Sequence, residues 1–136
     1  MRVLLVEEDR LVARSLDRLL AFAGPDDIEL STATTLDEAL LLLANLRFEV
    51  VVSDMRDSTG QTVMEVARRQ SPQALRLALS GHAEAEEVAP LLSPAHRHLA
   101  KPLRYVELER IFDRLTWLRT LLPPGQTRTL LHHLKE

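Results

Sequence analysis

Residues 3–9 read Val3-Leu4-Leu5-Val6-Glu7-Glu8-Asp9, four apolar residues followed directly by three acids. A short apolar run without polar alternation is typical of a strand that is buried on both faces, as in a parallel sheet. Residues 11–20 then repeat apolar side chains at helical spacing until Gly24-Pro25, a pair that ends helices. The start of the chain therefore predicts a strand followed by a helix.

The same alternation continues along the chain. Further strands are expected over residues 28–32, 48–52, 75–79 and 96–100, and further helices over residues 36–46, 61–70, 83–92 and 104–122. The helix at 36–46 opens on Thr35-Leu36-Asp37-Glu38, which has the form of a capping box. Pro90 is expected to kink or shorten the helix at 83–92. Alternating strands and helices indicate an α/β fold. We expect a flavodoxin-like three-layer sandwich, with a five-stranded parallel sheet in the order 2-1-3-4-5 and five helices.

Length and composition fit one small domain. The chain has 136 residues, 17 Lys plus Arg against 20 Asp plus Glu, 46% hydrophobic residues and no Cys. We expect the domain over residues 1–122 and a linker or tail over 123–136, because Pro123-Pro124-Gly125 ends the last helix. The absence of Cys excludes disulfides and thiolate metal sites.

Charge and hydropathy argue against two classes of partner. A formal net charge of -3 gives no general attraction to nucleic acid, and no helix-turn-helix unit or basic stripe is apparent. No apolar run approaches the roughly 20 residues of a membrane helix. We therefore expect a cytoplasmic protein without direct nucleic acid or membrane binding.

Polar residues follow four of the expected strands, at Glu7-Glu8-Asp9, Asp54, Ser80 and Lys101. In an open parallel sheet, ligands bind outside the carboxyl ends of the strands. Carboxylate oxygens there could hold Mg²⁺, which also keeps waters and accepts a phosphate oxygen. The chain has 15 Arg but only two Lys, so a Lys inside the fold indicates a specific role.

These motifs, in this order, resemble the receiver domain of bacterial two-component response regulators over roughly residues 2–122. The acids after the first strand look like the family's acidic pocket, and Val51-Val52-Ser53-Asp54 looks like the strand that carries its phosphoacceptor. Leu79-Ser80-Gly81 and Leu99-Ala100-Lys101-Pro102 match the two remaining motifs. Each motif alone is weak, but four of them at the right strand ends are specific.

The resemblance implies a role for each matching residue. Asp54 would be the nucleophile that becomes an aspartyl phosphate. Lys101 and Ser80 would contact the phosphoryl group, and Ser80 and His98 would occupy the family's switch positions. The Mg²⁺ ligands implied by the resemblance are Glu8, Asp54 and the backbone carbonyl of Arg56, with Glu7 acting through water.

The resemblance also implies partners. A sensor histidine kinase or a phosphotransfer protein would supply the phosphoryl group, and an output domain or effector protein would respond, so the chain would be a switch and not an enzyme. Residues 77–83 and 94–102 look most like receivers attached to HD-related output domains, which suggests a portion of a longer protein. The end of the last helix, with Trp117, is expected to be exposed and could pair with a second copy.

Two departures from the family pattern keep an alternative open. The loop from Asp54 to Gly60 is short, lacks Pro and adds the carboxylate of Asp57, and Glu8 replaces the usual Asp. The second hypothesis is therefore a pseudo-receiver, an interaction module that phosphorylation does not regulate. A third is a haloacid-dehalogenase-like phosphatase, although its nucleophile would end the first strand and precede a second Asp by two positions.

Structural explanations also exist for the individual residues. The acids after the first strand could favour the first turn of a helix through its dipole, and Asp54 could cap a turn. Ser80 precedes Gly81, a common turn composition. His82, His96 and His98 have no ordinary zinc spacing. The four motifs together favour a site over these local explanations.

Overall fold

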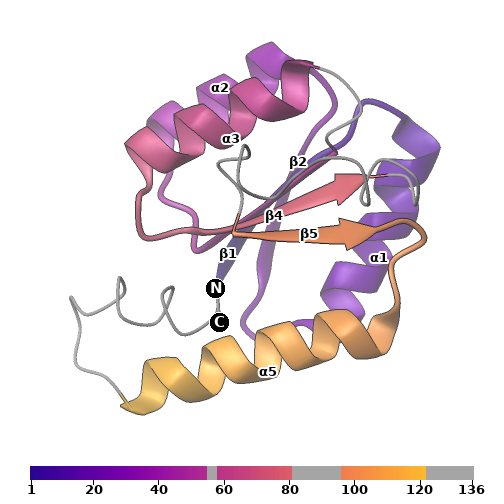
Figure 1. The fold of residues 1–136 in the computed structure, drawn as a ribbon, viewed down its shortest axis with the longest axis vertical. Coiled ribbons are helices and arrows are strands. Elements are labelled where there is room, and N and C mark those ends of the chain that lie inside the picture. The colour runs from indigo at the N-terminus through magenta and orange to yellow at the C-terminus, as the bar shows by residue number, and fades with distance from the viewer. Residues whose placement is uncertain (55–57, 81–95, 122–136) are drawn as a thin grey trace.

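A computed structural model describes residues 1–54, 58–80 and 96–121 (Figure 1). The strands are β1 (Arg2–Val6), β2 (Glu29–Ala33), β3 (Val50–Asp54), β4 (Leu75–Ser80) and β5 (Arg97–Ala100). The helices are α1 (Arg10–Ala23), α2 (Leu36–Asn45), α3 (Ser58–Gln70) and α5 (Tyr105–Leu121). The helix predicted over residues 83–92 lies outside the described residues.

All five strands pair in parallel, in the order β2-β1-β3-β4-β5. Helices α1 and α5 cover one face of the sheet, and α2 and α3 cover the other (Figure 1). The predicted flavodoxin-like sandwich and its strand order are therefore confirmed.

Strands β1 and β3 are buried on both faces, as their unbroken apolar runs predict. Val3 and Leu5 of β1 belong to the core beneath α1 and α5, whereas Leu4 and Val6 belong to the core beneath α2 and α3. All four side chains are at most 5% exposed. Successive side chains of β1 therefore pack alternately into the two cores, one on each face of the sheet.

Local capping fixes where the helices begin. The Thr35 hydroxyl accepts a hydrogen bond from the Glu38 backbone N–H at 3.2 Å, which confirms half of the predicted capping box. The Glu38 carboxylate accepts from the N–H of Thr34, one residue before the cap. Helix α3 begins at Ser58, three residues before the predicted start, because residues expected to form a loop make its first turn.

Helix α5 has the buried stripe that its apolar spacing predicts. Its buried residues are Leu108, Ile111, Phe112, Leu115 and Leu118. On the opposite side, Trp117 is 59% and Leu121 is 57% exposed, so the end of the helix presents apolar surface as expected. None of the helices in the described part of the chain combines the length and apolarity needed to cross a bilayer.

Candidate functional site

The register of the sheet brings the predicted polar residues to one edge. Val6 of β1 is level with Ser53 of β3, so Glu7 and Asp54 follow side by side. At the other side of the site, Ala100 of β5 is level with Ser80, and Lys101 comes next. The carboxyl ends of β1, β3 and β5 therefore meet, as expected for a parallel sheet.

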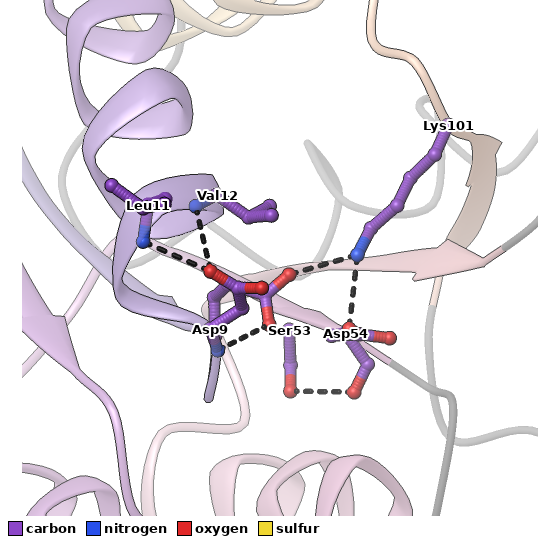
Figure 2. A network of polar contacts seen from close by, with 7 residues as sticks. Asp9, Leu11, Val12, Ser53, Asp54 and Lys101 are labelled. Atoms are coloured by element: carbon purple, nitrogen blue, oxygen red, sulfur yellow. Dashed lines mark hydrogen bonds and ion pairs between the residues drawn. The ribbon is translucent and has the colours of Figure 1, made fainter.

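Lys101 joins the two carboxylates at this edge. Its Nζ donates to Glu7 Oε1 at 2.8 Å. It also donates to Asp54 Oδ2 at 2.9 Å (Figure 2). These partners are 94 and 47 residues away in the sequence. The side chains of Glu7, Asp54 and Lys101 are 0%, 9% and 22% exposed, so the three charges are largely removed from water.

Further hydrogen bonds hold the acidic side of the site. Glu7 Oε2 accepts from the backbone N–H of Asp9 at 3.2 Å, and the Glu7 N–H donates to the Ala33 carbonyl at 3.0 Å. Asp9 caps α1 by accepting from the N–H groups of Leu11 and Val12 (Figure 2). Asp9 is therefore a helix cap, and Glu7 is fixed toward the centre of the edge.

Burial and charge act in opposite directions on the ammonium. Burial lowers the pKa of Lys101, but the hydrogen bonds and charges of Glu7 and Asp54 raise it by more, so the pKa lies above the ordinary value of 10.5. Lys101 is consequently a cation at physiological pH. With two carboxylates and one ammonium, the cluster has a net charge of -1 and attracts a further cation.

The donor chemistry of this edge suits Mg²⁺. A magnesium site usually has one or two protein carboxylates, several waters and a phosphate oxygen. Glu7 and Asp54 supply two such carboxylates. Within the described ranges, no group of three or more His, Cys, Asp or Glu side chains forms a metal cage. The residues present therefore fit a site in which protein carboxylates, waters and a phosphate oxygen together bind Mg²⁺. They fit less well a site in which protein side chains supply every ligand.

The structure does not gather all the predicted site residues. It brings together Asp54, Lys101 and Glu7, whereas the side chain of Glu8 is exposed. Arg56 lies outside the described residues. Ser80 ends β4, and its backbone is level with Ala100, but its side chain is not among those described.

Sequence reasoning missed the direct contact between Glu7 and Lys101. The alternation of side chains along β1 could have indicated this contact. Continued past the end of the strand, it places Glu7 on the same face of the sheet as Leu5, and Glu8 on the same face as Val6. Ser53 was also missed: it is fully buried, and its hydroxyl donates to the Asp54 carbonyl at 3.3 Å. An unbroken run of small and apolar residues gives no hint of that bond.

His98 lies in β5, level with Ala78 of β4. Both of its ring nitrogens are buried, and neither has a hydrogen-bond partner among the residues that the structure describes. Burial lowers the pKa of His98 below the ordinary value of 6.5. A neutral imidazole thus occupies the predicted switch position.

Replacing His98 by Phe is expected to make the free energy of unfolding depend less steeply on pH in the acidic range. Because the folded state disfavours the proton, the unfolded chain binds more protons below pH 6.5, and the free energy of unfolding falls as pH decreases there. Urea titrations of both proteins at several pH values between about 5 and 8 measure this slope. Equal slopes for wild type and His98→Phe would contradict the role of burial.

Comparison with known proteins identifies a family. The family model described as response regulator receiver domain matches residues 3–113. No curated protein matches the chain.

Solved structures with the same fold support the match. A CheY-like response regulator receiver domain protein from Methanospirillum hungatei has 26% identity and a TM-score of 0.72, over 89% of this chain and 98% of that one. A structure described as an adenylate cyclase from Rhodopirellula baltica has 28% identity and a TM-score of 0.65, over 88% and 95%. The receiver domain of a Pseudomonas aeruginosa sensor histidine kinase, with magnesium in its active site cleft, has 21% identity and a TM-score of 0.69, over 83% and 94%.

Proposed function

The chain belongs to the response regulator receiver domain family, and on that basis we propose that it is a phosphorylation-controlled switch whose phosphoacceptor is Asp54. One observation supports this assignment most strongly: Lys101 Nζ lies 2.9 Å from Asp54 Oδ2 at the carboxyl edge of the sheet. The only Lys before the tail is thereby beside a carboxylate that can act as a nucleophile. The Lys101 ammonium, which pairs with the Asp54 carboxylate, can pair instead with an oxygen of a phosphoryl group on Asp54.

The proposed reaction transfers a phosphoryl group from a phosphohistidine. An Asp54 carboxylate oxygen attacks phosphorus, an O–P bond forms, and the N–P bond breaks with its electron pair remaining on the imidazole nitrogen. Lys101 then pairs with a phosphoryl oxygen, a task for which its compact and flexible ammonium is suited. Glu7 keeps Lys101 in place during this change, because it holds the same Nζ at 2.8 Å.

Magnesium is the proposed cofactor. Asp54 and Glu8, together with the carbonyl of Arg56, are the residues that would hold it, and Glu7 would act through water. When bound, Mg²⁺ would neutralise charge on the carboxylates and the phosphoryl oxygens. The negative net charge of the described cluster supports this proposal, as does the magnesium in the cleft of the Pseudomonas receiver domain.

The proposed output runs through Ser80 and His98. Ser80 would hydrogen-bond the new phosphoryl group and draw its loop toward the site. The imidazole of His98, which has no hydrogen-bond partner in the described structure, would repack as the loop moves. A packing contact with two stable arrangements can transmit a small change at Asp54 to the β5 side of the domain.

The proposed partners follow from this chemistry. A sensor histidine kinase or a phosphotransfer protein would donate the phosphoryl group. An output domain, such as an HD-related one in a longer protein, or a separate effector would read the switch. Pairing of two copies through the end of α5, where Trp117 and Leu121 are exposed, stays a prediction.

A pseudo-receiver is the second candidate function. The ion pairs of Lys101 with Glu7 and Asp54 compensate one of the two buried negative charges without any ligand. Glu8, the acid that the family pattern makes a direct metal ligand, is exposed. A domain that keeps the fold but does not bind Mg²⁺ tightly would have this arrangement.

Uptake of a phosphoryl group separates the two candidates. Incubation of the wild-type chain with acetyl phosphate and Mg²⁺ is expected to add one phosphoryl group, seen by intact-protein mass spectrometry, and a chelator is expected to prevent it. Reduction of the acyl phosphate with borohydride then marks the modified residue for peptide mapping. A folded chain that gains no mass under these conditions would support the pseudo-receiver.

A further inference from the structure

A pocket lies at the amino-terminal edge of the sheet, opposite the edge that carries the candidate phosphorylation site. It has a volume of about 360 Å³, and its lining includes Arg47, Glu49, Ser71, Leu115 and Arg119. Figure 1 shows that α3 and α5 both end on the side of the sheet where β4 begins. Glu49 directly precedes β3, so the length of this strand, about 13 Å, separates the pocket from Asp54.

The apolar part of the lining comes from both layers of the fold. Phe48 and Ala74 belong to the core beneath α2 and α3, and Leu115 belongs to the core beneath α1 and α5. All three side chains are at most 4% exposed. Small-molecule sites are concave, mostly apolar and about 300–1,000 Å³ in volume. The pocket therefore has the size and the lining of a site for a small organic molecule.

Ser71 brings an unpaired hydroxyl to this pocket. The residue is 8% exposed, and its Oγ has no hydrogen-bond partner among the residues that the structure describes. Its backbone is held in place, because its N–H donates to the Ala67 carbonyl at 2.8 Å and its carbonyl accepts from the Ala74 N–H at 2.9 Å. Buried hydroxyls are usually paired, since an unpaired one costs free energy of folding. Rotation about the Cα–Cβ bond moves Oγ between staggered positions, so a ligand atom in the pocket can supply the missing partner.

The charged residues of the lining favour a ligand with a single negative charge. They are Arg47, Arg119 and Glu49, which together have a net charge of +1. Arg119 forms an ion pair with Glu49. Arg47 is exposed and forms no ion pair or hydrogen bond within the described part of the chain. The Arg47 guanidinium is therefore available to a ligand, and its planar fork matches a carboxylate.

We propose that this pocket binds a small monocarboxylic acid with a planar apolar body. The body would pack against Phe48 and Leu115, which are buried on the two sides of the sheet edge. The carboxylate would pair with Arg47, and the Ser71 hydroxyl would donate to an oxygen of the ligand. Each unsatisfied group of the lining then has a partner.

Two other classes of ligand fit the pocket less well. A phosphate ester has up to two negative charges, and α3 ends at Gln70, beside Ser71, where the partial negative charge of a helix C-terminus disfavours it. A metal cation would need several oxygen ligands. Glu49 is the one acid of the lining, and it is already paired with Arg119.

Amide chemical shifts of the full chain test the proposal. The probe is 6-hydroxy-2-naphthoate, a planar molecule with a carboxylate at one end and a hydroxyl at the other. We expect saturable shifts at the amides of Ser71, Ala74 and Leu115, with a dissociation constant of about 1 mM or tighter. The neutral 6-hydroxy-2-naphthamide is expected to bind at least about fivefold more weakly, because it has no charge to pair with Arg47.

Three variants locate the contacts. Arg47→Gln is expected to bind the acid at least about fivefold more weakly, whereas Arg14→Gln, an equal charge change at an exposed residue of α1, should stay within about twofold. Ser71→Ala is expected to bind at least about threefold more weakly, yet to melt at a temperature no lower than wild type, because it removes a buried hydroxyl without a partner. A serine with a purely structural role would not combine weaker binding with undiminished stability.

Several outcomes would overturn the proposal. These are the absence of saturable shifts, shifts centred on another part of the chain, equal binding of the acid and the amide, wild-type affinity in Arg47→Gln or Ser71→Ala, and displacement of the acid by inorganic phosphate. The experiment needs neither Mg²⁺ nor a phosphodonor, so its failure is distinguishable from failure of the proposed phosphotransfer. Asp54→Asn is accordingly expected to bind the acid as the wild type does.

Discussion

Replacement of Lys101 by Met is expected to lower the free energy of unfolding by about 2–3 kcal/mol at neutral pH. Lys101 pairs with Glu7 and Asp54, whose side chains are 0% and 9% exposed. Removing one member of a buried ion cluster costs about 3–5 kcal/mol, because it leaves uncompensated charge in the interior. The smaller value follows from the partial exposure of Lys101, which lets water replace part of the lost interaction.

The pH dependence of this effect identifies its origin. The folded-state pKa of Lys101 is raised, so its contribution to stability is complete below pH 10.5 and is lost as pH rises through the higher folded value. The difference between wild type and Lys101→Met should therefore shrink in strong base. It should also shrink in acid, where the carboxylates are protonated. Both proteins retain Tyr105, whose pKa is also raised, so its titration cancels in the comparison.

Urea titration across this pH range measures the effect, and Lys101→Arg is the control that retains the charge. If Lys101→Met is as stable as wild type at pH 7, the ion pairs make no net contribution. Addition of Mg²⁺ should stabilise Lys101→Met more than wild type, because the unpaired carboxylates bind the metal more tightly and binding to the folded state raises stability.

Replacement of Asp54 by Asn is expected to abolish phosphoryl uptake while leaving the fold intact. A neutral amide oxygen is a poor nucleophile, so no acyl phosphate should form. The amide oxygen can still accept the hydrogen bond that Lys101 donates at 2.9 Å. We therefore expect the stability of Asp54→Asn to differ from wild type by no more than about 1 kcal/mol.

Radiolabelled acetyl phosphate with Mg²⁺ measures the uptake for wild type and for Asp54→Asn. Asp57→Asn is the matched control, because it removes an acid from the sequence just after Asp54 and should remain labelled. Labelling of Asp54→Asn at the wild-type level, or its loss only in Asp57→Asn, would place the phosphoacceptor elsewhere.

The strands of the sheet were predictable because the residues within each strand are sufficient to indicate it. The unbroken apolar runs of β1 and β3 indicate strands buried on both faces, and Thr35 with Glu38 marks the start of α2. The ends of elements were less predictable. Helix α3 begins at Ser58, three residues before the expected position, within a stretch whose composition is typical of a turn.

The site was predictable as a set of residue types at strand ends, but not in its detailed pairing. The motifs placed Asp54 and Lys101 correctly at one edge of the sheet. They did not show which of three consecutive acids faces Lys101, because that depends on a contact 94 residues away and on Asp9 serving as the cap of α1. Alternation along β1 favours Glu7 for this contact, whereas the family pattern gives the direct metal contact to Glu8.

Amide chemical shifts provide the most direct test of the central claim that Asp54, Lys101 and Glu7 form a phosphorylation switch. Spectra are recorded with Mg²⁺, before and after addition of beryllofluoride, which mimics a phosphoryl group on Asp, for wild type and Asp54→Asn. We predict changes at Asp54, Ser80 and Lys101 that require both Mg²⁺ and the Asp54 carboxylate and that extend to His98. Unchanged spectra of a well-folded wild-type chain would contradict the claim and identify a pseudo-receiver.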